Sequence, residues 1–144
     1  MTISAITDEL NHLPISNFED YAQLDRLAEL TDLLAQNPDG YQACGALLAL
    51  AERHPQVEFG VPGPLVHTLE TYRSHYENLL LASLERRPTT TTIWLLNRLL
   101  NAMEGPGKQT LTAKLESLLT HPAADAQAQA AAQDFYRFQT SARA

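Results

Sequence analysis

The sequence predicts an all-α fold in which seven or eight short antiparallel helices are stacked as an array of helix-pair repeats. Leucine and alanine dominate the apolar residues, while aromatic residues make up only 7% of the chain, a composition that favours helix. Pro55, Pro88 and Pro122 each follow a leucine-rich segment and lie 33 and 34 residues apart. Strand patterns are nearly absent, because only residues 56–61 alternate between polar and apolar side chains.

The residues in front of these prolines give the spacing a physical meaning. A basic side chain directly precedes each proline, and these side chains are His54, Arg87 and His121. A basic residue in the last turn complements the negative end of a helix, and a proline just beyond it cannot continue the helix. Pro38 and Gly105-Pro106 fall near the half periods, so stop signals recur every ~17 residues and predict helices of about 12–16 residues joined by short turns.

Start signals complete the assignment of the helices. Ser16 with Glu19, and Ser74 with Glu77, have the spacing of a capping box. After Pro88, one of the four threonines is expected to cap the next helix, with a phosphorylation site as the alternative. The predicted helices cover residues 3–12, 17–36, 40–53, 63–73, 75–87, 90–103, 109–120 and 123–138.

The chain length and the leucine positions predict a single all-helical domain over residues 1–144. A domain of this size needs neither a disulfide nor a metal to fold. The helix over 90–103 is apolar around most of its circumference, which is typical of a central helix. The predicted core consists of Leu24, Leu27, Leu48, Leu81, Leu84, Ile93, Leu96, Leu100, Leu115 and Leu118.

The distribution of charge indicates the kind of partner. The net charge is −7, and residues 1–40 hold eight acidic residues against Arg26 alone, while the remaining residues balance. An acidic surface suits a basic protein and disfavours nucleic acid as a partner. With no apolar run of the ~20 residues that a membrane helix needs, no signal peptide and a single cysteine, we expect a cytoplasmic protein without a membrane partner.

The predicted helix over residues 17–36 carries leucines on one side and acidic residues on the other. The opposite side spans about 80° of the helix at 100° per residue and consists of Tyr21, Asp25, Glu29, Asp32 and Gln36. This side is either a solvated acidic face or a protein-binding face with an aromatic anchor. A second candidate binding site is Trp94, Arg98 and Asn101, although amides on a central helix can also serve packing.

Signals for catalysis are scarce, so we expect no enzyme, no catalytic residue, no metal and no cofactor. The segment GVPGPL, residues 60–65, has prolines where a phosphate-binding loop needs backbone N–H groups. Cys44 lies between small residues in an apolar helix, which is typical of a buried and inert thiol. His67 and Glu70 share one helical face, but a metal site in a bundle would need a matching pair on a second helix.

Residues 60–101 resemble a group of small bacterial immunity proteins of contact-dependent growth inhibition and other polymorphic toxin–antitoxin systems. The similar elements are GPLVHTLE, YENLLLASLERRP and, after a threonine-containing turn, WLLNRLLN. The resemblance implies an all-helical, HEAT-like protein that binds and neutralises a cognate toxin domain, commonly a nuclease, by masking its active surface. It assigns no binding residue. The alternative hypothesis is a helical-repeat adaptor or scaffold that binds another protein.

Overall fold

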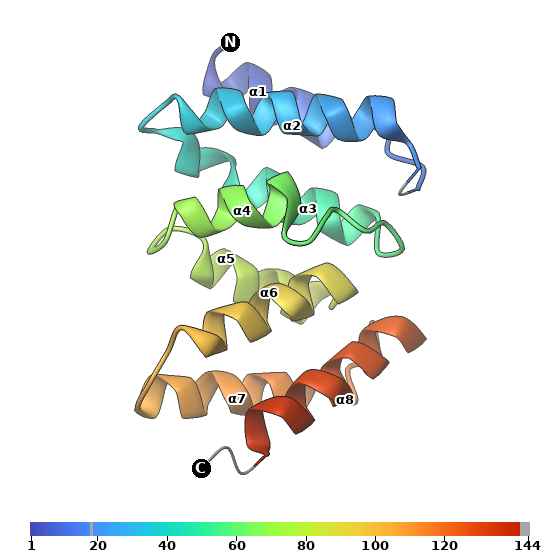
Figure 1. The fold of residues 1–144 in the computed structure, drawn as a ribbon, viewed down its shortest axis with the longest axis vertical. Coiled ribbons are helices and arrows are strands. Elements are labelled where there is room, and N and C mark those ends of the chain that lie inside the picture. The colour runs from blue at the N-terminus through green and yellow to red at the C-terminus, as the bar shows by residue number, and fades with distance from the viewer. Residues whose placement is uncertain (18, 142–144) are drawn as a thin grey trace. The chain divides into compact units, whose positions relative to one another are not determined.

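The computed structural model describes residues 1–17 and 19–141, which form eight α-helices and one 3-10 helix without any strand. The all-α prediction is therefore confirmed (Figure 1). The elements are α1 (Ile3–Asn11), α2 (Tyr21–Ala35), η1 (Gly40–Ala43), α3 (Cys44–Arg53), α4 (Gly63–Thr71), α5 (Glu77–Arg86), α6 (Thr90–Asn101), α7 (Pro106–Leu118) and α8 (Ala126–Thr140).

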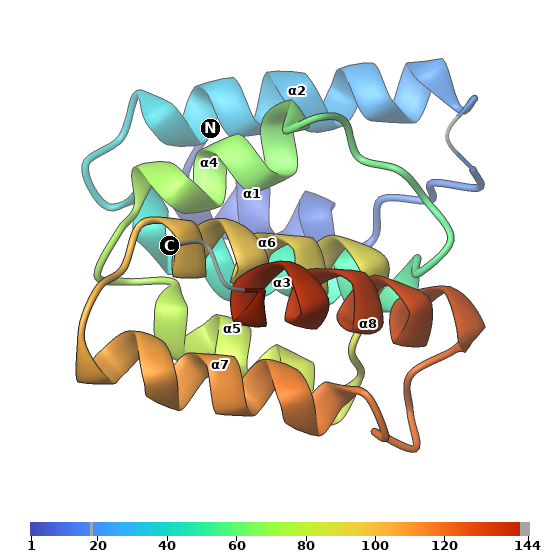
Figure 2. The ribbon, with the colours of Figure 1, turned by 60° about the horizontal axis from the view of Figure 1, so that its bottom comes forward.

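The chain divides into two compact units, an N-terminal unit (Met1–Ala82) and a C-terminal unit (Ser83–Ala144). In the N-terminal unit α1 packs on α2 and α3, and α2 packs on α4. In the C-terminal unit α8 packs on both α6 and α7 (Figure 2). Within each unit a helix thus contacts both the next helix and the one after it, as in stacked helix pairs. The single domain over residues 1–144 stays a prediction.

The two units also differ in charge. The N-terminal unit contains twelve acidic residues and three arginines, so its formal net charge is −9. The C-terminal unit contains five acidic and seven basic residues, so its net charge is +2. The acidic character of the whole chain therefore belongs to the N-terminal unit.

Eight of the ten predicted core residues are buried, and the prediction is wrong for Leu24 and Leu81, which are half-buried. On α5 the buried leucines are Leu80 and Leu84, one turn apart, and Leu81 lies 100° away from that row. Leu24 lies in the first turn of α2, where its side chain lines an open groove. Both errors have one cause, because a helical row of leucines can be wider than the surface that covers it.

The threonines after Pro88 form a capping box at the start of α6. The Thr89 hydroxyl accepts a hydrogen bond from the Thr92 N–H at 3.2 Å, and the Thr92 hydroxyl accepts one from the Thr89 N–H at 3.0 Å. Both side chains are buried. The prediction that one of these threonines caps the helix is confirmed, and Thr89 is that residue.

The helix boundaries needed several corrections. The prediction of a helix from residue 17 is wrong, because α2 begins at Tyr21 and Asp20 is its N-cap. Ser16 does not cap this helix; its N–H instead donates to the Asp20 carboxylate at 3.1 Å. The part of the prediction that falls on residue 18 lies outside the described residues. Residues 40–53 form η1 followed by α3 rather than one continuous helix.

Candidate protein-binding site

Five side chains form an exposed face on α2, which we call the acidic face. Its members share one side of the helix because their positions repeat at three and four residues. All are exposed, and Tyr21 keeps 69% of its surface accessible. The acidic face consists of Tyr21, Asp25, Glu29 and Asp32 on α2 and of Gln36 at its C-cap. The structure thus places all five residues of the predicted binding face on one side, whereas their role in binding stays a prediction.

The carboxylates of the acidic face do not carry equal free charge. Arg26 donates from Nη1 to Glu29 at 2.8 Å and from Nη2 to Glu9 on α1 at 2.7 Å, and its Nε also donates to Glu9. The Arg26 guanidinium holds the pKa of Glu9 below its usual value. Arg26, the only arginine or lysine among the first forty residues, is therefore engaged with both Glu9 and Glu29.

Asp25 and Asp32 have no such counter-charge. Within residues 1–17 and 19–141 neither carboxylate takes part in an ion pair, and both are exposed. Of the three acids on the acidic face, Asp25 and Asp32 therefore contribute more uncompensated charge than Glu29. The Arg26–Glu29 pair is a local i,i+3 pair, whereas the sharing of Arg26 with Glu9, 17 residues away, could not be read from the sequence.

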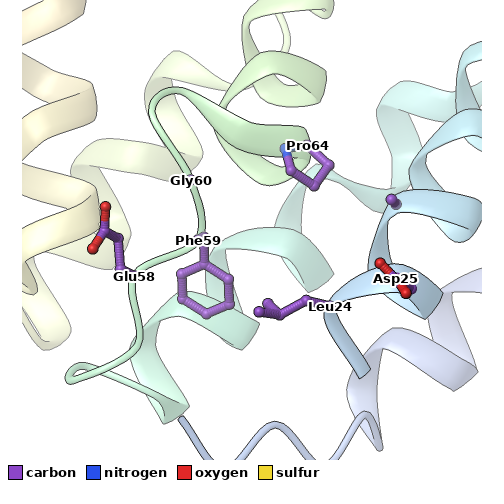
Figure 3. Close-up of a pocket in the computed structure, with 7 residues that line it drawn as sticks. Leu24, Asp25, Glu58, Phe59, Gly60 and Pro64 are labelled. Carbon is purple, nitrogen blue, oxygen red and sulfur yellow. The ribbon is translucent and has the colours of Figure 1, made fainter. Parts of the chain in front are cut away.

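A groove runs alongside the acidic face, and we call it the α2 groove. It has a volume of about 460 Å³ and is bordered by α2, by the loop before α4 and by the start of α4. Figure 3 shows Phe59 and Leu24 directed toward one another, with Asp25 beside Leu24 on α2 and Pro64 on α4. The complete lining is Leu24, Asp25, Ala28, Glu58, Phe59, Gly60 and Pro64.

The loop segment that forms one wall is the strand-like stretch of the sequence. Val57 and Phe59 are buried, while Glu58 between them is exposed and its carboxylate points away from Leu24 in Figure 3. An extended chain places successive side chains on opposite sides, so the alternation survives without a strand partner. The sequence shows this alternation, but nothing in it indicates that Phe59 faces α2.

Gly60 permits the sharp path of this wall. Its φ is +113°, a conformation that side-chain-bearing residues rarely adopt, and a Cβ atom there would lie 2.5 Å from the Gly63 Cα. Beyond this turn Val61 is 78% exposed. Tight backbone geometry on one side and buried Phe59 on the other fix the loop against the N-terminal unit.

The residues of the second candidate binding site, Trp94, Arg98 and Asn101, have partners inside the C-terminal unit. The Arg98 guanidinium lies 5.1 Å from the centre of the Trp94 ring, and both residues are half-buried. Gln139 on α8 donates from Nε2 to the Oδ1 atoms of Asn97 at 2.7 Å and Asn101 at 2.9 Å. These polar side chains therefore hold α6 to α8, and a role in partner binding stays a prediction.

Cys44 is poorly suited to act as a catalytic nucleophile. Cys44 is fully buried, and burial, together with the negative charge of Glu77, raises the pKa of its thiol to about 11. The thiolate that would attack a substrate is thus disfavoured at neutral pH. His67 is exposed and Glu70 half-buried on α4, and among the residues described no three His, Cys, Asp or Glu side chains gather as a metal site.

In the described part of the chain, every helix is too short or too polar to cross a membrane. No family model matches the chain, and the searches of curated proteins and of solved structures also gave no match.

Proposed function

We propose that this protein is an immunity protein that binds a cognate bacterial toxin domain through the acidic face of α2 and masks its active surface. The observation that carries the proposal is the exposed row of uncompensated carboxylates, Asp25 and Asp32, next to the exposed ring of Tyr21. The resemblance of residues 60–101 to bacterial immunity proteins supplies the class of partner.

In this proposal, charge raises the rate of association and apolar surface slows dissociation. Carboxylates clustered on a unit of net charge −9 attract a basic surface and raise the rate of encounter. An aromatic side chain that becomes buried on binding, as Tyr21 would, slows dissociation. A toxin that cleaves nucleic acid needs a basic cleft for its substrate, so an acidic protein can occupy that cleft and block it.

The proposal expects the gene beside this one to encode a large secreted protein with a toxin as its C-terminal domain, and the test measures association with that domain. The Asp25→Lys/Asp32→Lys variant should associate about tenfold more slowly than the parent at low salt, because two attractive charges become repulsive. The difference should shrink as the Debye length falls from ~10 Å at 0.1 M to ~3 Å at 1 M salt. The parent should also abolish the activity of that toxin domain.

A matched control separates the acidic face from net charge alone. Glu104→Lys/Asp134→Lys changes the net charge equally, and both of these side chains are exposed in the C-terminal unit. This control should associate within about twofold of the parent. Equal slowing of both variants would show that only overall charge matters, and unchanged rates for the α2 variant would move the binding site elsewhere.

A second candidate function is that of a helical-repeat adaptor that joins other proteins. The packing of α1 on both α2 and α3, and of α6 on both α7 and α8, favours this alternative, because stacked helices present extended binding surfaces. The toxin assay distinguishes the two functions. An adaptor would bind its partner through the same face and leave toxin activity unchanged.

A further inference from the structure

The α2 groove differs in chemistry from the acidic face beside it. Its walls are built from carbon-rich side chains, namely Leu24 and Ala28 on α2, Phe59 on the loop and Pro64 on α4 (Figure 3). Leu24 is only half-buried although it belongs to the leucine side of the helix. An open hollow lined by half-buried apolar side chains is typical of a site for a partner side chain.

Charge at the rim indicates what kind of segment would enter. Asp25 lines the groove and belongs to the acidic face, and Glu58 lines it from the loop. Both carboxylates are exposed and, among the described residues, neither takes part in an ion pair. The groove therefore offers an apolar floor with an acidic edge at Asp25, while the Glu58 carboxylate, directed to the other side of the loop (Figure 3), adds only to the negative charge of the region. This combination complements an apolar side chain with a basic neighbour.

We infer that the α2 groove is a docking site for a segment of a protein partner that carries an apolar side chain next to lysine or arginine. The inference rests on the proposed function, since the partner is the protein held by the acidic face, and it adds how that partner is anchored. The apolar side chain lies over Phe59 and against Leu24 and Pro64. Its basic neighbour lies beside Asp25.

The groove volume agrees with this assignment. About 460 Å³ holds one or two large side chains but not a folded element. Phe59 is only 4% exposed, so the floor is already in place before a partner arrives. A preformed pocket saves the entropy of ordering the site and so makes a single anchor effective. The exposed side chain of Tyr21, one turn before Leu24, would cover the edge of the bound segment.

The experiment titrates the isotope-labelled full chain with three synthetic seven-residue peptides and follows amide chemical shifts by NMR. The first peptide has a central leucine between lysine and arginine. The second replaces this leucine by serine, and the third replaces both bases by glutamate. Only the first should shift the amide signals of Leu24, Asp25, Ala28 and Gly60 in a saturable manner. The serine peptide should give shifts at least fivefold smaller, and the acidic peptide none.

Variants of the groove give a second measurement. Ala28→Trp fills the hollow and should weaken binding of the leucine peptide at least tenfold. Ala22→Trp places the same ring on an exposed part of α2 that does not line the groove, so its affinity should stay within twofold of the parent. Circular dichroism checks that each variant keeps its helices. Should Ala28→Trp fail to fold, Asp25→Lys tests the basic flank and should weaken binding at least threefold.

The outcomes separate this inference from the proposed function. Equal binding of the leucine and serine peptides, or shifts away from the groove, would overturn the docking site. If the toxin domain binds the parent and Ala28→Trp alike, the proposed function stands and the groove does not. If the leucine peptide binds as expected while the toxin remains active, the groove stands and the neutralising function fails.

Discussion

Two helices in different units, α2 and α6, each carry an aromatic residue in line with polar or charged side chains, but these side chains have different surroundings. On α2 an aromatic residue, Tyr21, stands in line with acidic side chains, and on α6 Trp94 stands in line with Arg98 and Asn101. The side chains on α6 have partners within the C-terminal unit, since Arg98 lies over Trp94 and Asn101 accepts a bond from Gln139. On α2, Tyr21 is 69% exposed.

The difference shows how a polar and aromatic row on a helix should be interpreted. Such a row indicates a binding face only where its hydrogen-bonding and charged groups are left without internal partners. On α6 the amides hold a neighbouring helix, which is a structural role. On α2 the carboxylates of Asp25 and Asp32 face solvent in a unit with a large negative charge. The comparison therefore favours the acidic face as the binding site.

The largest expected effect compares two leucines, one from each region. Leu96→Ala on α6 should destabilise the protein by about 2–5 kcal/mol, because Leu96 is fully buried and its removal leaves a cavity. Leu24→Ala should cost less than about 2 kcal/mol, because Leu24 already borders an open groove. Urea unfolding of both variants measures the difference. Equal losses would mean that the α2 groove is closed in solution.

An intermediate effect is expected at the contact between α6 and α8. Gln139→Ala removes the donor shared by Asn97 and Asn101 and should cost about 1 kcal/mol, since Asn97 is buried. The loss is modest because Gln139 Oε1 has no hydrogen-bond partner within the described residues, which already weakens the native contact. The exposed Gln133→Ala on the same helix is the control. If both variants matched the parent in thermal unfolding, these amides would be free for a partner.

The smallest effect concerns the ion pair of Arg26 with Glu9, close to the acidic face. Glu9 has its pKa lowered by the Arg26 guanidinium, so the pair stabilises the fold above the usual carboxyl pKa of 4.5. That contribution is lost as pH falls from 4.5 through the lower pKa of the folded state. Arg26→Gln should therefore melt slightly below the parent at pH 7, with the gap closing in more acidic solution. A gap that is constant with pH would mean that Arg26 stabilises by packing alone.

Much of the helical pattern could be predicted from the sequence because its signals are local. The proline after Arg87 and the Thr89 cap are read from adjacent residues, and both mark boundaries that the structure contains. The prediction for the start of α2 is wrong because Ser16 and Glu19 have the spacing of a capping box, whereas Asp20 occupies the N-cap position. Ser16 and Asp20, four residues apart, are both suitable N-cap residues, and the sequence alone does not decide between them.

The sequence by itself determined the helices, the confinement of negative charge to one end and the alignment of five side chains on α2, because these follow from composition and a 3.6-residue period. The tertiary structure decided which side chains have partners within the fold and which remain available to bind another protein. It brought Arg26 to Glu9 across 17 residues, Gln139 to Asn97 across 42, and Phe59 opposite Leu24 to form the groove. These contacts join distant parts of the chain, and their partners are set by packing of whole helices rather than by any local pattern.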